Sequence, residues 1–227
     1  IEIVKGAASA LYGSNAAGGV INIITKKGVR NFALNVNARW SKHNEQRYGL
    51  SLQLGKKQWN NLLTVNRNSV DNYNVTNGLH PITRVISTIY GDKVWDFKDQ
   101  LSYSPNEKIK ITGRAGYFFR QMTRTEEVPE RYRDFTGGLR GEWKPTENDE
   151  LSLAYSFDQY DKSDYQRITR LDIRDYSNVQ NSVRLLYNHT FSGGNVLSVG
   201  TDFMHDYLFN TNIEGHTRTQ DAFDAFA

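Results

Sequence analysis

The stretch that decides the fold is residues 1–30, IEIVKGAASALYGSNAAGGVINIITKKGVR. Gly13, Gly18 and Gly19 stand before a strand-like run, residues 20–26, and permit tight turns there because glycine adopts positive φ angles freely. After Lys27 the pattern changes to segments in which apolar and polar residues alternate. We therefore expect a junction between two units, residues 1–28 and residues 29–227.

The alternation has a period of two and begins at Phe32. Phe32, Val36 and Trp40 fall on one face of the first segment, and Arg39 falls on the other. Such a period is expected of a strand with one face against an apolar medium and the other against water. Asp99 breaks the apolar face of one later segment. Nine strands are predicted in this way, at residues 32–40, 48–54, 59–65, 95–103, 109–119, 135–143, 151–157, 183–187 and 197–207, and residues 221–227 begin a tenth.

The connecting segments are of two kinds. Short turns with Pro or Gly occur at residues 104–107, 144–149 and 192–195, whereas long polar stretches occupy residues 70–92, 121–131, 161–178 and 210–220. A short hairpin at residues 42–46 is the exception on the long-loop side. Short turns at one rim and long loops at the other are typical of outer-membrane β-barrels. A soluble β-sandwich would alternate too, and the charges deep in the strands, at Arg114 and Arg140, leave the barrel and the sandwich about equally well supported at this point.

Composition excludes several classes of protein. Apolar residues make up 38% of the chain and the mean hydropathy is −0.65, which excludes a helical membrane protein. The 13 Tyr, 11 Phe and 4 Trp suit the aromatic girdles of a membrane barrel. There is no cysteine, and the net charge is only +3, so we expect neither a thiolate site nor nucleic-acid binding.

No pattern in the sequence predicts catalysis or a cofactor. The glycines of GSNAAGG are followed by Val20 and Ile21 rather than by the Lys and Ser or Thr of a phosphate-binding loop. The five histidines are scattered, and no nucleophile and base stand at a catalytic spacing. We expect a protein that is not an enzyme and holds no metal or cofactor of its own.

Residues 1–27 resemble the end of the plug domain of TonB-dependent outer-membrane receptors. That family typically reads I-E-x-(V/I)-(R/K)-G-x-x-S-A-L-Y-G-x-x-A-x-G-G-V-I-N-I-I-T-K. The residues that carry the resemblance include Gly6, Ser9, Ala10, Leu11, Tyr12, Gly13, Gly18, Gly19 and Asn22. The match spans about the first tenth of the chain.

The resemblance implies an all-β fold: the end of a plug (residues 1–28), then the first nine or ten strands of an antiparallel transmembrane barrel of about 22 strands (residues 29–227). The whole receptor is then expected to be longer at both ends. Phe32, Val36 and Trp40 would face lipid, and Arg39, Arg114 and Arg140 would face the lumen or the plug.

Lys5 stands where plugs of this family usually carry an Arg that pairs with carboxylates of the barrel wall. Lysine keeps the charge but lacks the bidentate fork of arginine. The resemblance therefore implies a weaker latch between plug and barrel, with its acidic partners expected on strands beyond Ala227.

The resemblance also implies function, location and partners. The receptor would lie in the outer membrane of a Gram-negative bacterium, in contact with lipid, and would import a scarce nutrient with energy from the TonB complex, which acts on a segment before residue 1. Glycan importers usually read A-S-A-A-A-I-Y-G with R-G-A-N-G-V, so AASALYGSNAAGGV favours an iron complex (a ferric siderophore or haem) or cobalamin. An importer of glycans or peptides, and a non-transporting adhesin or sensor, remain as alternatives.

Overall fold

The computed structural model describes residues 2–5, 19–22, 31–75, 88–123 and 128–227. Within these residues all regular structure is β-strand, and all strand pairs are antiparallel. The described residues include no helix that is long and apolar enough to cross a membrane.

Two strands near the start of the chain form a small sheet of their own. β1 (Glu2–Lys5) pairs with β2 (Gly19–Asn22), and Lys5 lies opposite Gly19. β2 overlaps the strand-like run predicted at residues 20–26. The glycine-rich stretch between these strands lies outside the described residues.

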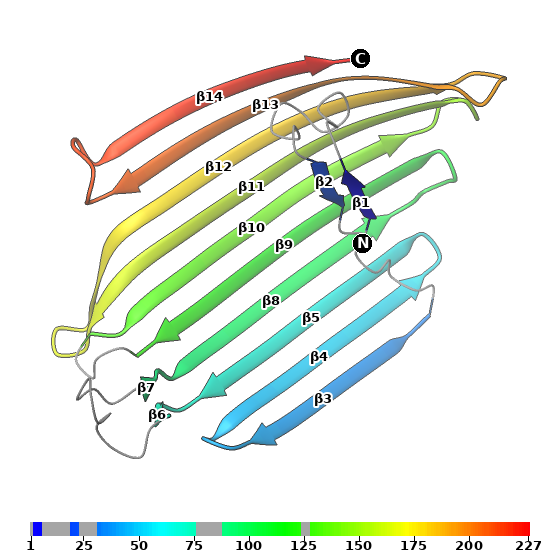
Figure 1. Ribbon diagram of the computed structural model, residues 1–227. Helices are drawn as coiled ribbons and strands as arrows, with labels where there is room; N and C mark the ends of the chain where they lie inside the picture. The colour runs from blue at the N-terminus through cyan, green and yellow to red at the C-terminus, as the bar shows by residue number, and fades with distance from the viewer. Residues whose placement is uncertain (1, 6–18, 23–30, 76–87, 124–127) are drawn as a thin grey trace.

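Ten strands form one open, curved sheet, as Figure 1 shows. Their order in the sheet follows their order in the chain, with β3 at one edge and β14 at the other. The predicted strands are therefore confirmed in number and sequence. They are β3 (Ala33–Ser41), β4 (Glu45–Lys56), β5 (Trp59–Val70), β8 (Asp92–Tyr103), β9 (Ile109–Met122), β10 (Glu130–Trp143), β11 (Asp149–Gln166), β12 (Leu171–Thr190), β13 (Val196–Asn210) and β14 (Thr217–Phe226).

Two of the predicted long loops are wrong in part. β11 continues to Gln166 and β12 begins at Leu171, so most of residues 161–178 is strand rather than loop. Both faces of this extension carry polar residues, so it lacks the alternation by which the other strands were found. A register shift between Lys162 and Ser163 marks the extension. Likewise, β14 begins at Thr217, inside the predicted loop 210–220.

The connection between β5 and β8 also contains regular structure. β6 (Tyr73–Asn74) pairs with β7 (Thr88–Ile89) as a short hairpin within the predicted loop 70–92. This hairpin meets the tight β3–β4 turn, because the His43 ring stacks on the Tyr73 ring with centroids 3.7 Å apart. The Asn44 amide donates to Asp71 at 3.0 Å in the same place. The short predicted hairpin at residues 42–46 is thus held by the next loop.

Candidate functional site: the two faces of the sheet

The register of the strands sorts their side chains onto two faces. Residues directly opposite each other on antiparallel strands point to the same side of a sheet. One row of such partners runs through Val36, Leu50, Val65, Phe97, Tyr117 and Phe135. These six residues are all aliphatic or aromatic, and the sequence alone could not show that they align.

This apolar face is exposed rather than packed against a core. Phe32, Val36 and Trp40, which were predicted to face lipid, are 67%, 67% and 71% exposed. Large apolar side chains are exposed on nearly every strand of the ten-stranded sheet. A monomeric soluble protein rarely exposes a continuous apolar surface of this kind. The face therefore requires an apolar surrounding.

Aromatic side chains border the apolar face at both ends of the strands. At the short-turn end the Trp59 and Tyr103 rings stack with centroids 4.2 Å apart. At the other end the Trp95 and Phe97 rings stack at 5.7 Å. Trp143 and Tyr187 continue the first border, and Trp40, Tyr48 and Tyr117 continue the second. Two aromatic belts on either side of an apolar band are characteristic of membrane-spanning proteins, in which each belt lies at one membrane–water interface.

The opposite face is polar and charged. Arg39, Arg114 and Arg140 all lie on it, because each alternates along its strand with a residue of the apolar face. The face carries ion pairs between neighbouring strands. Arg120 contacts Asp92 at 2.7 Å, and the Arg184 guanidinium binds Asp202 with two nitrogens, Nε at 2.6 Å and Nη2 at 2.5 Å.

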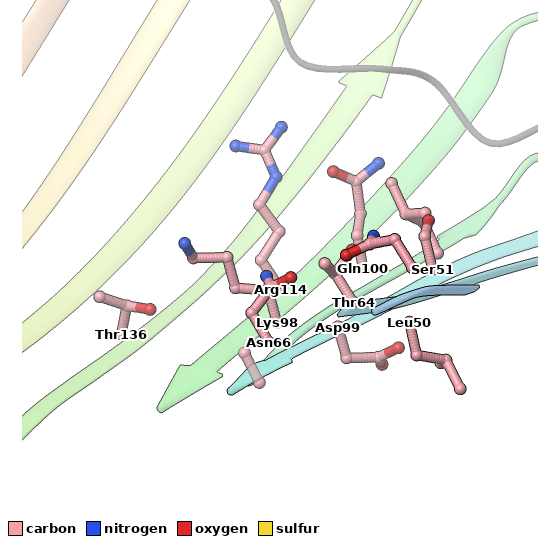
Figure 2. A pocket seen from close by; sticks show the side chains of 12 residues that line it. Leu50, Ser51, Thr64, Asn66, Lys98, Asp99, Gln100, Arg114 and Thr136 are labelled. Carbon is pink, nitrogen blue, oxygen red and sulfur yellow. The ribbon is translucent and has the colours of Figure 1, made fainter. Parts of the chain in front are cut away.

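The polar face is hollowed over β4, β5, β8 and β9. The hollow measures about 580 Å³. Figure 2 shows Lys98, Gln100 and Arg114 on one side of the sheet, while Leu50 and Asp99 point to the other. Among the described residues Arg114 has no ion-pair partner, so its charge is available to a group that enters the hollow. The polar-face residues that line it are Asn37, Ser51, Leu62, Thr64, Asn66, Lys98, Gln100, Arg114 and Thr136.

Carboxylates on the polar face also retain acceptor capacity. Within the described part of the chain, one oxygen each of Asp96, Asp134 and Asp206 is shielded from water without a hydrogen-bond partner. Shielded polar atoms normally find a partner. The wall is therefore suited to contact a polar body that supplies donors.

A polar cluster closes the short-turn end of β11 and β12. Asp149 accepts hydrogen bonds from the Thr146 hydroxyl at 2.5 Å and the Tyr187 hydroxyl at 2.6 Å, and its Oδ1 lies 2.7 Å from His189 Nδ1. These contacts stabilise the ionised carboxylate and hold the pKa of Asp149 below its usual range. The cluster fixes the strand ends at this rim.

Most of the residues predicted from the plug motif lie outside the residues that the structure describes. Lys5 is the last residue of β1, and Gly19 and Asn22 bound β2. Gly6, Ser9, Ala10, Leu11, Tyr12, Gly13 and Gly18 lie outside the described residues. The described residues include no group of three or more His, Asp or Glu side chains that could hold a metal ion.

One polar pair on the apolar face was missed from the sequence. The Asn61 amide donates to Asp99 Oδ1 at 2.7 Å and lies 3.3 Å from the Gln100 carbonyl oxygen. Asp99 was recognised as a break in the alternation. Its partner was not, because Asn61 becomes a neighbour only once β5 and β8 are known to be adjacent.

The structure is similar to those of several solved receptors and transporters. The siderophore receptor PiuA from Acinetobacter baumannii superposes with a TM-score of 0.70 at 12% identity, over 99% of this chain and 42% of that one. The ferric enterobactin receptor PfeA from Pseudomonas aeruginosa gives 0.68 at 16% identity, over 97% and 40%. The copper transporter OprC gives 0.63 at 14% identity, over 98% and 37%.

The chain thus spans about two fifths of the length of these receptors. No protein-family model matches the sequence. At these identities the likeness concerns architecture, and it agrees with the exposed apolar face, the two aromatic belts and the polar opposite face. The ten-stranded sheet has the fold of TonB-dependent outer-membrane receptors, as an open sector of their β-barrel.

Proposed function

We propose that the chain is part of a TonB-dependent outer-membrane receptor that imports an iron complex, a ferric siderophore or haem, or else cobalamin. The observation that carries the proposal is the two-faced wall: an apolar band between aromatic belts outside, and a charged, hollowed face inside. The plug-like sequence of residues 1–27 supports it independently of the sheet.

The wall suggests how such a receptor works. A lumen lined by charges fills with water, so a wide barrel leaks unless a folded plug fills it. Arg114 and the carboxylates Asp96, Asp134 and Asp206 offer the plug contacts of both signs. Contacts of this kind in a wet lumen are individually weak, which suits a plug that must be displaced during transport. The energy would come from the TonB complex through a segment before residue 1.

The choice of nutrient rests on the sequence and on the neighbours in fold. The segment AASALYGSNAAGGV departs from the pattern usual in glycan importers. Two of the structural neighbours are a siderophore receptor and a ferric enterobactin receptor. Both favour an iron complex. Copper joins the test panel because a third neighbour is a copper transporter.

The test is a binding titration of the full-length receptor in detergent against ferric siderophores, haem, cobalamin and copper(II), with iron-free siderophores as controls. We expect tight, saturable binding of one iron complex or of cobalamin. If a ferric siderophore binds, its iron-free form should not bind. Binding of oligosaccharides or peptides instead would favour the glycan or peptide importer. If no nutrient binds and uptake is normal in a deletion strain, the adhesin or sensor replaces the transporter.

A further inference from the structure

A patch of basic residues lies on the apolar side of the sheet, at its long-loop end. It comprises Arg67, Lys93, Arg131, Arg133 and Arg174, and is called the outer basic patch below. The strand register places it. The row of partners next above the apolar row contains Arg67, Trp95, Phe119 and Arg133, and the following row contains Lys93, Gln121 and Arg131. The patch therefore begins one residue pair above the apolar band, about 7 Å along the strands.

The arginines at one end of the patch are held side by side. Asp172 Oδ2 accepts from Arg131 Nη1 at 3.0 Å and from Arg133 Nη2 at 2.9 Å. Arg133 Nη1 also donates to the Ser163 hydroxyl at 3.0 Å. The Arg131 guanidinium lies over the Tyr165 ring, 3.4 Å from its centroid. These contacts fix two guanidinium groups in place before any ligand arrives.

The other members extend the patch in both directions. Arg67 lies over the Trp95 ring at 5.5 Å and near the Tyr48 ring at 6.0 Å, so its charge sits directly on the upper aromatic belt. Arg174 contacts Asp161 at 3.2 Å and is half exposed. The acidic residues of this surface, among those described, are Asp161 and Asp172. Among the described residues, five cations stand against two carboxylates, so the described part of this surface has a net positive charge.

The guanidinium groups keep hydrogen-bond donors for a further ligand. Each guanidinium has five N–H donors. Arg131 uses Nε, toward Gln121, and Nη1, while Arg133 uses Nη1 and Nη2. Their forks match the oxygens of a phosphate group in shape and charge.

We infer that the outer basic patch binds the phosphate-bearing headgroup of an anionic lipid in the leaflet at the long-loop end. The inference rests on the proposed function, because it requires the apolar face to lie in a bilayer. Continuity supports it: headgroup phosphates lie just outside the hydrocarbon, at the level where the patch follows the aromatic belt. Charge complementarity supports it as well, since clustered Lys and Arg near a membrane surface attract anionic lipids.

The test compares phosphatidylglycerol with phosphatidylcholine as ligands of the full-length, delipidated receptor, with bound lipid counted by native mass spectrometry. We expect the wild type to prefer phosphatidylglycerol. The double variant Arg131→Gln/Arg133→Gln is expected to lose about 10- to 30-fold of that preference, from two surface cations. The control, Arg114→Gln/Arg140→Gln, removes the same charge from the polar face and should keep the preference.

Three outcomes would overturn the inference. The double variant keeps the preference, the control loses as much of it, or millimolar inorganic phosphate abolishes it, which would indicate a site for free anions. If Arg131→Gln/Arg133→Gln does not fold, Arg67→Gln/Lys93→Gln tests the other end of the patch. The proposed function fails separately: a receptor that binds no nutrient but prefers anionic lipid refutes the transport ligand and leaves this inference standing.

Discussion

At the scale of single residues, Asn61 and Asp99 are the least expected feature of the apolar face. A carboxylate in hydrocarbon is costly unless it is neutralised or bonded. Asn61 supplies one hydrogen bond, at 2.7 Å, and the polar backbone of Gln100 lies beside it. The pair therefore reduces a cost that Asp99 alone would impose, but it does not remove it.

We predict that the double substitution Asn61→Leu/Asp99→Leu stabilises the receptor. It replaces two polar groups on the lipid-facing surface with apolar ones and leaves no orphaned partner. The expected gain is about 1–2 kcal/mol in the free energy of unfolding, below the cost of Arg or Lys at the midplane. Urea unfolding in lipid vesicles measures it. Asp99→Leu alone should gain less, because Asn61 then loses its shorter hydrogen bond and keeps only the one to the Gln100 carbonyl oxygen at 3.3 Å. A loss of stability in the double variant would contradict the lipid-facing assignment of this pair.

Asp149 gives a prediction about pH at the short-turn rim. Hydrogen bonds from Thr146, Tyr187 and His189 lower its pKa in the folded state. A group of this kind contributes stability that is fully present above its unfolded pKa, about 3.9, and is lost as the pH falls through the folded pKa. The urea midpoint of wild type should therefore exceed that of Asp149→Asn down to about pH 4, and the difference should shrink as the pH falls further toward the folded pKa. Convergence already above pH 5 would show that the carboxylate is not the stabilising group.

Single residues also show what the sequence could and could not reveal. The placement of Phe32, Val36 and Trp40 on one apolar face followed from alternation alone, because a single apolar surrounding imposes the period of two. The partners of Asp99 and of Arg131 did not, because they depend on register. Asp172 contacts Arg131 although the two are 41 residues apart in the sequence, and no local sequence pattern predicts such a contact.

At the scale of elements, the apolar alternation specified the ten strands but not their full lengths. β11 and β12 have 18 and 20 residues, well beyond the 9–11 that cross a membrane. Their extensions around Ser163 and Arg174 carry polar side chains on both faces, so backbone pairing and polar contacts hold them without an apolar face. The predicted loop 161–178 was wrong for this physical reason.

Opposite faces of one strand should respond differently to charge. Leu52 and Ser51 are neighbours on β4, and their partners on β3 are Leu34 and Asn35. We predict that Leu52→Arg lowers stability by about 2–4 kcal/mol, the cost of an arginine near the bilayer midplane. Ser51→Arg should cost little, since it faces the polar lumen. Folding yield and urea midpoint measure both, and the reverse order of effects would invert the facing of the entire sheet.

At the scale of the whole molecule, we expect the polar wall to form half of an interface. Asp96, Asp134 and Asp206 lack partners for one oxygen each in the described part of the chain, so a polar body opposite them would complete their bonding. Residues 1–27 resemble the end of such a body. Carboxylates are thus available on this part of the wall, in addition to the later strands from which the resemblance led us to expect the partners of Lys5.

Lys5 provides the test of this interface in the full-length receptor. We predict that Lys5→Gln weakens the seating of the plug by about 0.2–1 kcal/mol, the worth of an ion pair in contact with water. Lys5→Arg should strengthen it, because the fork can bind a carboxylate with two parallel hydrogen bonds. Plug release is measured as the urea concentration at which the receptor conducts ions across a planar bilayer. Lys27→Gln is the control, since it removes an equal charge just past the motif.

The partner of Lys5 follows from a double-mutant cycle with the wall. If Lys5 pairs with Asp134, the effect of Lys5→Gln disappears in an Asp134→Asn background, whereas independent effects add. Additive effects with Asp96, Asp134 and Asp206 alike would place the partner on other strands of the barrel. If Lys5→Gln and Lys27→Gln release the plug at the same urea concentration as wild type, Lys5 is an ordinary solvated lysine. The plug would then be held by its remaining polar contacts with the wall.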